Sequence, residues 1–191
     1  NLYPAFHRRR DTHANPFGPS WAPDGTRLAL SDGDRLYLWT LATGALDSVP
    51  GLSDAAFPRW SPDGRWIAFT HYPRDSAVVR SCSAPVGRMG ACFNDLHVFY
   101  SAAPEVWIVH PDGSAPTLVT TGEQPGWMPT SDALVVRRTT GLVVVDLAGV
   151  VRASLAVGDA SEPAVSPDGR RIAFVSRNAG GIDLWTVALS P

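Results

Sequence analysis

The stretch Pro58-Arg59-Trp60-Ser61-Pro62-Asp63-Gly64-Arg65-Trp66-Ile67-Ala68-Phe69 predicts a strand, a tight turn and a second strand. Ser-Pro-Asp-Gly supplies the turn. Pro62 restricts φ, Asp63 can accept hydrogen bonds from the backbone that follows it, and Gly64 tolerates a positive φ. The apolar residues from Trp66 to Phe69 then continue as a short strand.

The same pattern occurs four times along the chain. Clear copies run from Ser20 to Leu30 and from Ala164 to Phe174. A degenerate copy runs from Gly126 to Val136, where Thr130-Ser131 stands in place of the Asp-Gly turn. A unit that recurs in this way indicates a repeat architecture, in which each repeat buries its apolar face against its neighbours.

Each repeat continues with two further strands. In the first repeat they are predicted at Arg35–Leu41 and Ala45–Val49, with a turn at each end. Four short antiparallel strands per repeat are typical of a β-propeller blade. The sequence therefore predicts an all-β fold with blades at about 18–50, 51–123, 124–157 and 158–191.

The ends of the chain suggest how the ring closes. The last repeat lacks a fourth strand, while Leu2–His7 can form a strand that belongs to no repeat. We expect residues 1–10 to complete the last blade, so that residues 1–191 form one four-bladed propeller domain. The alternative is that the chain is part of a six- or seven-bladed propeller.

The second repeat carries an insertion at about 73–104. It contains the only two cysteines, Cys82 and Cys92, which enclose nine residues. Two cysteines so close together, without further metal-type ligands at a suitable spacing, favour a local disulfide and an oxidising compartment. The alternative is two free thiols in a cytosolic loop.

Composition sets limits on the partners. Apolar residues make up 45% of the chain and charged residues 18%, which is typical of a globular protein. A net charge of −2 offers no broad attraction to nucleic acid or anionic lipid. No apolar run approaches the roughly 20 residues of a transmembrane segment. The chain begins at Asn1, so a removed leader, a missing N-terminal segment and a longer parent protein all stay open.

The repeat resembles that of TolB-type propellers. The resemblance rests on Trp60-Ser61-Pro62-Asp63-Gly64 with the strand after it, on the other copies, and on third strands such as Leu36–Trp39. It covers nearly the whole chain outside residues 1–17 and 73–104. It implies a β-propeller fold. Proteins with this repeat include periplasmic interaction modules, sensor domains and peptidase lids, so it implies no single function.

Candidate chemistry is sparse. Asp24, Asp63 and Asp168 recur at equivalent positions and could together bind a cation, but the turn by itself explains them. The five histidines show no metal-ligand spacing, and the chain has no Gly-x-Ser-x-Gly nucleophile motif. We therefore expect no catalytic residues, no cofactor and no metal site, and a protein that is not an enzyme.

The insertion is the feature that the repeat does not explain. Phe93, Leu96, Phe99 and Tyr100 give it aromatic and apolar character, and Trp66 breaks the period of the other tryptophans. These five residues are the candidate protein-binding residues; the alternative is that they pack back onto the blade. We expect a protein-binding scaffold, an accessory subunit of a periplasmic, secreted or membrane-associated complex. The alternatives are a lid or fragment of a larger hydrolase or lyase, or a ligand- or metal-sensing domain.

Overall fold

The described part of the chain is built entirely of antiparallel strands. The computed structural model describes residues 17–83, 91–100, 102–178 and 181–189. Within these residues there are seventeen strands in four blade-like sheets and one separate pair. All of them pair antiparallel.

Each sheet corresponds to one of the predicted repeats. Blade 1 contains β1 (Phe17–Trp21), β2 (Arg27–Ser31), β3 (Leu36–Thr40) and β4 (Ala45–Ser48). Blade 2 contains β5 (Ala55–Trp60), β6 (Ile67–His71), β9 (Glu105–Val109) and β10 (Thr117–Thr121). Blade 3 contains β11 (Glu123–Trp127), β12 (Ala133–Arg138), β13 (Gly141–Asp146) and β14 (Val151–Leu155). Blade 4 contains β15 (Ala160–Val165), β16 (Arg171–Asn178) and β17 (Gly181–Ala188).

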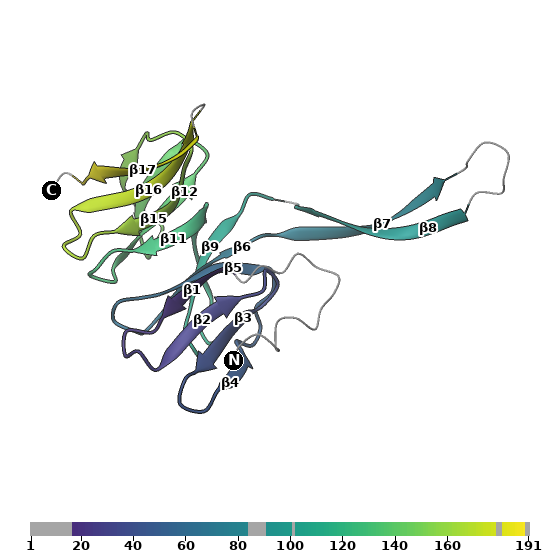
Figure 1. Cartoon of the computed structure of the whole chain (residues 1–191), viewed down its shortest axis with the longest axis horizontal. Helices are drawn as coiled ribbons and strands as arrows, with labels where there is room; N and C mark the ends of the chain where they lie inside the picture. Colours follow the sequence, from purple (N-terminus) through teal and green to yellow (C-terminus); the bar gives the residue numbers. More distant parts are fainter. Residues whose placement is uncertain (1–16, 84–90, 101, 179–180, 190–191) are drawn as a thin grey trace.

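The four sheets follow one another around an arc (Figure 1). Their first strands line the inside, where β5 packs against β1 and β11, and β11 packs against β15. This is the arrangement of propeller blades, and it confirms the predicted fold class. Among the described residues, β15 makes no comparable contact with β1, so ring closure is not shown. The strand predicted to close blade 4, within residues 1–10, lies outside the described residues.

The Ser-Pro-Asp-Gly turns form as the residues dictate. In blade 2 the amide of Gly64, at φ 75°, donates to the carbonyl of Ser61 over 2.9 Å. Asp63 accepts hydrogen bonds from the Ser61 hydroxyl at 2.6 Å and from the Arg65 amide at 3.1 Å. In the degenerate copy, Ser131 takes the place of glycine at φ 60°. A non-glycine residue in this conformation costs roughly 1–2 kcal/mol, so other contacts must hold that turn.

The core lies between adjacent blades. Trp60, at the end of β5, is 6% exposed and packs in one cluster with Ala22 and Leu38 of blade 1. Trp127, at the end of β11, is 8% exposed and packs with Ile108 of blade 2. Trp60 and Trp127 therefore pack one sheet against the next at these two interfaces.

Every inner strand carries a bulge that the sequence did not reveal. The strand register shifts between Phe17 and Ser20, and at the equivalent place in the other three blades. The residue three positions before each strand end has a left-handed backbone. These residues are Gly18, Phe57, Gln124 and Glu162, with φ between 48° and 53°. A bulge bends its strand and increases the local twist, so the inner strands can curve around the axis of the arc.

We predict that a tryptophan-to-alanine substitution at the end of the inner strand lowers the free energy of unfolding by different amounts in blades 1 and 3. Trp127→Ala should lower the free energy of unfolding by about 3–5 kcal/mol, because it empties a buried position. It also removes the hydrogen bond from the indole Nε1 to the Arg59 carbonyl. Trp21→Ala should cost less than about 1 kcal/mol, because Trp21 is 57% exposed. Urea unfolding in dilute solution measures both values, and equal losses would contradict the blade-to-blade packing.

Candidate functional site

The insertion in blade 2 forms a long β-hairpin. β7 (Arg74–Ser83) and β8 (Ala91–Tyr100) pair without interruption, from Arg74 opposite Tyr100 to Ser83 opposite Ala91. They connect β6 to β9 and extend as a two-stranded ribbon away from the blades (Figure 1). Apart from residues 84–90, which are not described, the insertion from 74 to 100 is therefore regular strand. Its β-branched and aromatic residues suit an extended backbone.

The register places the two cysteines face to face. Cys82 lies directly opposite Cys92 in the pair. Residues opposite each other in antiparallel strands have Cα atoms about 4.5–5.5 Å apart. This spacing lies inside the range of about 4.4–6.8 Å that a disulfide requires. The backbone is thus compatible with the predicted bond, which itself stays a prediction.

Four of the predicted binding residues lie along β8. Because neighbouring residues of a strand alternate between its two faces, Phe93 and Phe99 belong to one face of the ribbon and Leu96 and Tyr100 to the other. Their side chains lie outside the described part of the structure. A ribbon of two strands is a single layer and has no core of its own.

The structure does not bring Trp66 together with these residues. Trp66 precedes β6, whereas the hairpin follows the other end of that strand. Its indole is half-buried and stacks on the ring of His110, with centroids 3.9 Å apart and planes 17° apart. It also packs against the apolar cluster between blades 2 and 3. Trp66 therefore packs at the opposite end of the blade from the hairpin, and its predicted binding role stays a prediction.

A polar network holds the base of the hairpin. The Tyr72 hydroxyl donates to Glu123 Oε2 over 2.7 Å, which joins blade 2 to blade 3. The other oxygen of Glu123 pairs with Arg137, and the same guanidinium reaches Asp159 at 3.0 Å. Arg137 Nε also donates to the Ala160 carbonyl, at the start of blade 4, over 2.8 Å. One chain of hydrogen bonds and ion pairs therefore links the hairpin base on blade 2 to blades 3 and 4.

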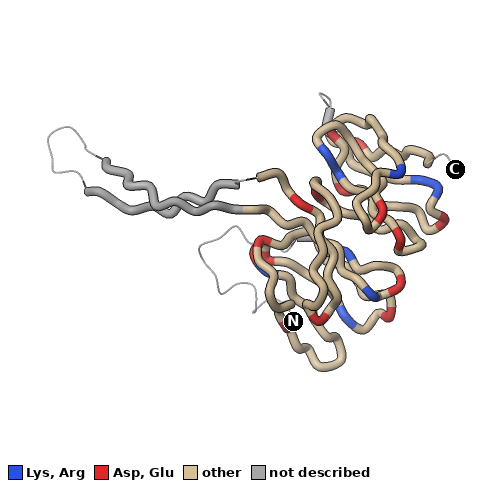
Figure 2. Tube along the Cα trace, turned by 180° about the vertical axis from the view of Figure 1, so that it is seen from behind, with Lys and Arg blue, Asp and Glu red and all other residues tan. Residues whose placement is uncertain are grey.

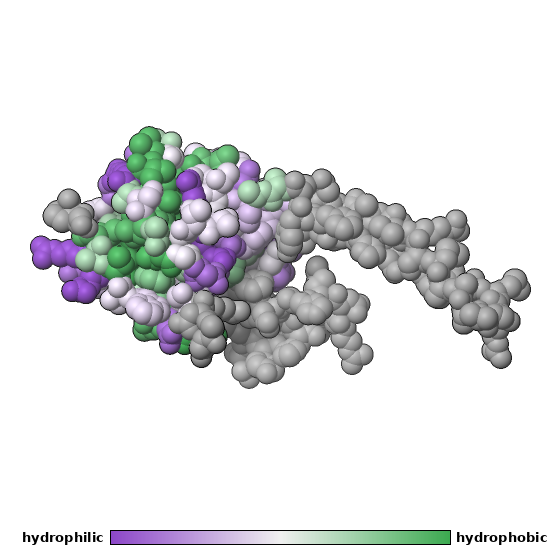
Figure 3. All heavy atoms as spheres, turned by 90° about the horizontal axis from the view of Figure 1, so that it is seen from above, coloured by the Kyte–Doolittle hydropathy of each residue, from purple (hydrophilic) through white to green (hydrophobic). Residues whose placement is uncertain are grey.

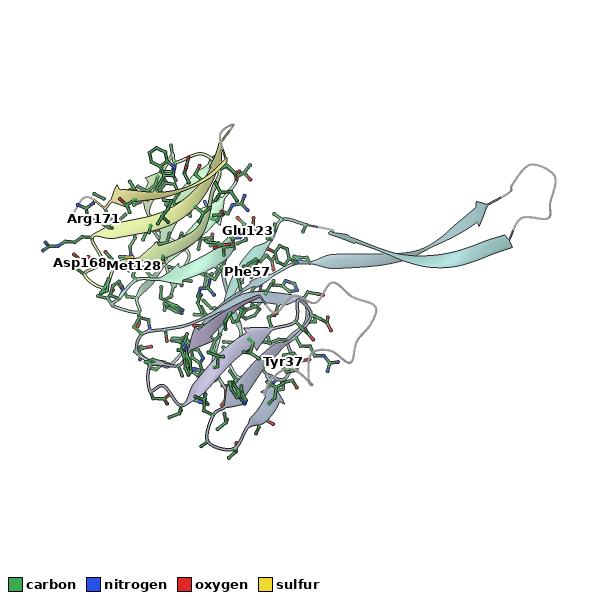
Figure 4. All side chains as sticks on the ribbon, in the orientation of Figure 1. Tyr37, Phe57, Glu123, Met128, Asp168 and Arg171 are labelled. Atoms are coloured by element: carbon green, nitrogen blue, oxygen red, sulfur yellow. The ribbon has the colours of Figure 1, made fainter. Side chains whose placement is uncertain are left out.

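The second strand of the hairpin is anchored at the same end. Glu105, which begins β9, accepts a hydrogen bond from the Trp107 indole at 2.9 Å and lies 3.3 Å from His71 Nδ1. The Pro104 carbonyl accepts the Gly122 amide at 2.7 Å. Beside this base lies a groove of about 610 Å³, lined in part by Pro104, Glu123 and Arg137. Figure 4 shows Glu123 close to where the hairpin leaves the blades.

The inner strands form a further polar cluster. Arg59 Nη1 donates to the Gly18 carbonyl of blade 1 over 2.9 Å. Burial lowers the pKa of the Arg59 guanidinium, and the charge of Glu162 opposes that shift. The Glu162 amide in turn donates to Gln124 Oε1 over 2.8 Å. These contacts tie the bulges of neighbouring blades together.

The turn carboxylates lie at the ends of the blades opposite the hairpin. A cleft of about 850 Å³ between blades 3 and 4 is lined in part by Asp132, Arg152 and Asp168. Met128, Asp168 and Arg171 lie near one another there, far from Glu123 (Figure 4). The Ser166 hydroxyl and the Arg170 amide donate to Asp168 and hold its pKa below the ordinary value.

The recurring aspartates act within their own turns. Asp24 accepts hydrogen bonds from the amide and hydroxyl of Thr26, which lower its pKa. Asp63 is bonded within its own turn in the same way, so the turn interpretation of these residues agrees with the geometry. No group of three or more metal-type ligands is found among the described residues.

Charge is spread over the described blades without a dominant sign. Arg residues and acidic residues alternate around the edges and turns (Figure 2). The structure thus shows no basic surface of the kind that binds nucleic acid across the residues it describes. Nor does any described segment form an apolar helix of membrane-spanning length.

Comparison with known proteins shows the fold. No protein-family model and no curated protein sequence matches the chain. Among solved structures, putative TolB from Agrobacterium tumefaciens matches with a TM-score of 0.66 and 23% identity, covering 93% of this chain and 59% of that chain. TolB from Acinetobacter baumannii matches with a TM-score of 0.64 and 19% identity, over 92% of this chain and 41% of the other.

A similar match comes from a structure of the nidogen/laminin complex, with a TM-score of 0.63 and 12% identity over 92% of this chain and 60% of that one. The chain therefore has the β-propeller fold seen in TolB. It spans about three fifths or less of the length of these matched chains.

We predict that Glu123 stabilises the hairpin base. Glu123→Ala should lower the free energy of unfolding by about 1–3 kcal/mol, because it leaves the mostly buried Arg137 and the Tyr72 hydroxyl without their shared acceptor. It should also speed hydrogen exchange at the Tyr72 amide. Asp47→Ala, at an exposed position of β4, serves as the control. Unchanged exchange at Tyr72 in the Glu123 variant would contradict the proposed anchoring.

We also predict a loss of stability in acid that depends on the turn aspartates. Burial raises the pKa of Asp63, but hydrogen bonds from Ser61 and Arg65 and the Arg65 charge outweigh it, so the net shift is downward. A carboxylate whose pKa is lower in the folded protein stabilises the fold at any pH above the pKa of the unfolded chain, which is about 3.9. This stabilisation is lost as the pH falls through the lower pKa of the folded protein.

Melting temperatures between about pH 2 and 6 therefore test this shift. Asp63→Asn should lower the melting temperature at pH 6 and reduce its fall in acid, while Asp47→Asn should leave the profile unchanged. A profile of Asp63→Asn parallel to the parent would contradict the assignment.

Proposed function

We propose that this chain is a non-catalytic, protein-binding propeller that acts as a scaffold or accessory subunit of an extracytoplasmic or membrane-associated complex. The observation that carries the proposal is the β7–β8 hairpin. It extends beyond the blades as an independent ribbon, while its base is tied to blades 2, 3 and 4. A projecting element on a rigid base is suited to capture a partner.

The chemistry of the ribbon supports a protein partner. Among the described residues, β7 and β8 pair only with each other, so each has an outer edge that can pair with an added strand. An extended partner segment can gain main-chain hydrogen bonds along such an edge and place its side chains in neighbouring pockets. Phe93 and Phe99 supply the aromatic anchors that favour such interfaces.

The proposed compartment rests on the cysteines. A disulfide between Cys82 and Cys92 would close the outer part of the hairpin and stiffen the ribbon. Such bonds persist in oxidising compartments such as the periplasm or the cell exterior. The TolB fold agrees with this setting but does not establish it, because propellers serve many functions.

We predict that the hairpin is required for partner capture. Replacement of residues 74–100 by a short glycine-containing turn should abolish recovery of a stoichiometric partner from the membrane fraction of the source cells, without unfolding the blades. The double variant Phe93→Ser and Phe99→Ser should weaken capture at least about tenfold, because aromatic anchors carry much of an interface's binding energy.

Val150→Ser is the matched control, since Val150 is an apolar residue that is 60% exposed on blade 3, away from the hairpin. Cross-links from the partner should map to β7 or β8. Full capture by the hairpin deletion, or cross-links confined to the blades, would overturn the proposal.

A further inference from the structure

The three internal blade interfaces share one buried position. The position lies on the third strand of each blade. It is defined by its pairing partner on the second strand, which lies ten residues after the last residue of the inner strand. In blades 1, 2 and 3 the residue at this position is Leu36, Val106 or Leu142, and each is 0% or 1% exposed. Each belongs to the apolar cluster shared with the following blade. We call it the receiving position.

In blade 4 the receiving position is exposed to solvent. Its counterpart is Leu184, which pairs with Val175 and is 76% exposed. Ile182, two residues earlier on the same strand face, is 67% exposed. In a propeller this face is covered by the next blade, and no strand of the described residues covers it here. Seen from the upper side of Figure 1, where blade 4 lies, the molecule shows a broad apolar surface (Figure 3).

The complementary half lies at the other end of the arc. Trp60 and Trp127 end their inner strands buried against the preceding blade, at 6% and 8% exposure. Trp21 ends the inner strand of blade 1 and is 57% exposed. Blade 1 thus presents the tryptophan that internal interfaces bury, and blade 4 presents the surface that receives it.

We propose that these two faces bind each other between two copies of this chain, head to tail, with Trp21 of one copy covering the Leu184 face of blade 4 in the other. The interface repeats the blade-to-blade packing within the chain, where Trp60 and Trp127 hold the place of Trp21. It is heterologous, because different surfaces of the two copies meet. The matched propellers extend well beyond the part this chain spans, so the fold accommodates more blades than these four.

The charge of the chain permits this association. A net charge of −2 produces little repulsion between copies. The contact uses blades 1 and 4 and leaves the β7–β8 hairpin free. A variant without the hairpin should therefore self-associate like the parent, so failure of this inference and failure of the proposed function are distinguishable.

The experiment is sedimentation of the purified chain over a range of concentrations. The parent should associate reversibly beyond a monomer. Trp21→Ala and Leu184→Glu should each weaken association at least about tenfold, because a central aromatic anchor is lost or a charge is placed against it. Leu118→Ser, at a residue 46% exposed on the outer strand of blade 2, is the matched control and should associate normally.

Mixing the two variants gives the sharpest test. Trp21→Ala keeps an intact blade 4 face, and Leu184→Glu keeps an intact Trp21. At a concentration where neither variant alone associates measurably, an equimolar mixture should therefore form a one-to-one dimer. Circular dichroism checks that both remain folded; if Leu184→Glu does not, Leu184→Thr replaces it. A parent chain that stays monomeric at all concentrations, or a mixture that stays monomeric, would overturn the inference.

Discussion

The structure depends on the contact between the end of each inner strand and the blade before it. Trp60 and Trp127 fill this contact at two of the three described interfaces, and Val165 takes the place at the third. The Trp127 indole also donates to the Arg59 carbonyl of blade 2. A single four-stranded sheet has two faces and no partner for either, so a blade gains its core only from its neighbours. Stability therefore spreads along the arc, and the two end blades each keep one face without a neighbouring blade from the described chain.

The bulges in the inner strands serve the same contact. Each bulge places one residue in a left-handed conformation, and at Phe57, Gln124 and Glu162 this residue is not glycine. Backbone strain of this kind costs of order 1–3 kcal/mol at each site and persists only where the surroundings enforce it. The Gln124 amide donates to Thr70 of blade 2, and the Glu162 amide donates to Gln124. The strain is thus offset by hydrogen bonds that connect consecutive blades.

The hairpin takes its direction from this connected framework. It replaces the short turn between the second and third strands of a blade, and its base lies where blades 2, 3 and 4 meet. Arg137 is central there because its planar guanidinium bonds two carboxylates and a backbone carbonyl at once. A ribbon held this way is positioned by the propeller, while its own strands stay available to a partner.

The sequence by itself determined the repeat, the turns, the approximate blades and the place of the insertion. These follow from local chemistry: Ser-Pro-Asp-Gly forms its turn from its own residues, and alternating apolar residues define strands wherever they occur. The sequence also shows Cys82 and Cys92 in one insertion, but only the strand register of the structure sets them opposite each other.

Only the tertiary structure decided which apolar residues are covered. Trp21 and Trp60 follow the same sequence pattern, yet one is largely exposed and the other buried, because burial depends on a neighbouring blade far away in sequence. The bulges at Gln124 and Glu162, and the Tyr72–Glu123–Arg137 chain, likewise join residues from different repeats. No local pattern encodes such contacts, since they exist only once the blades are packed together.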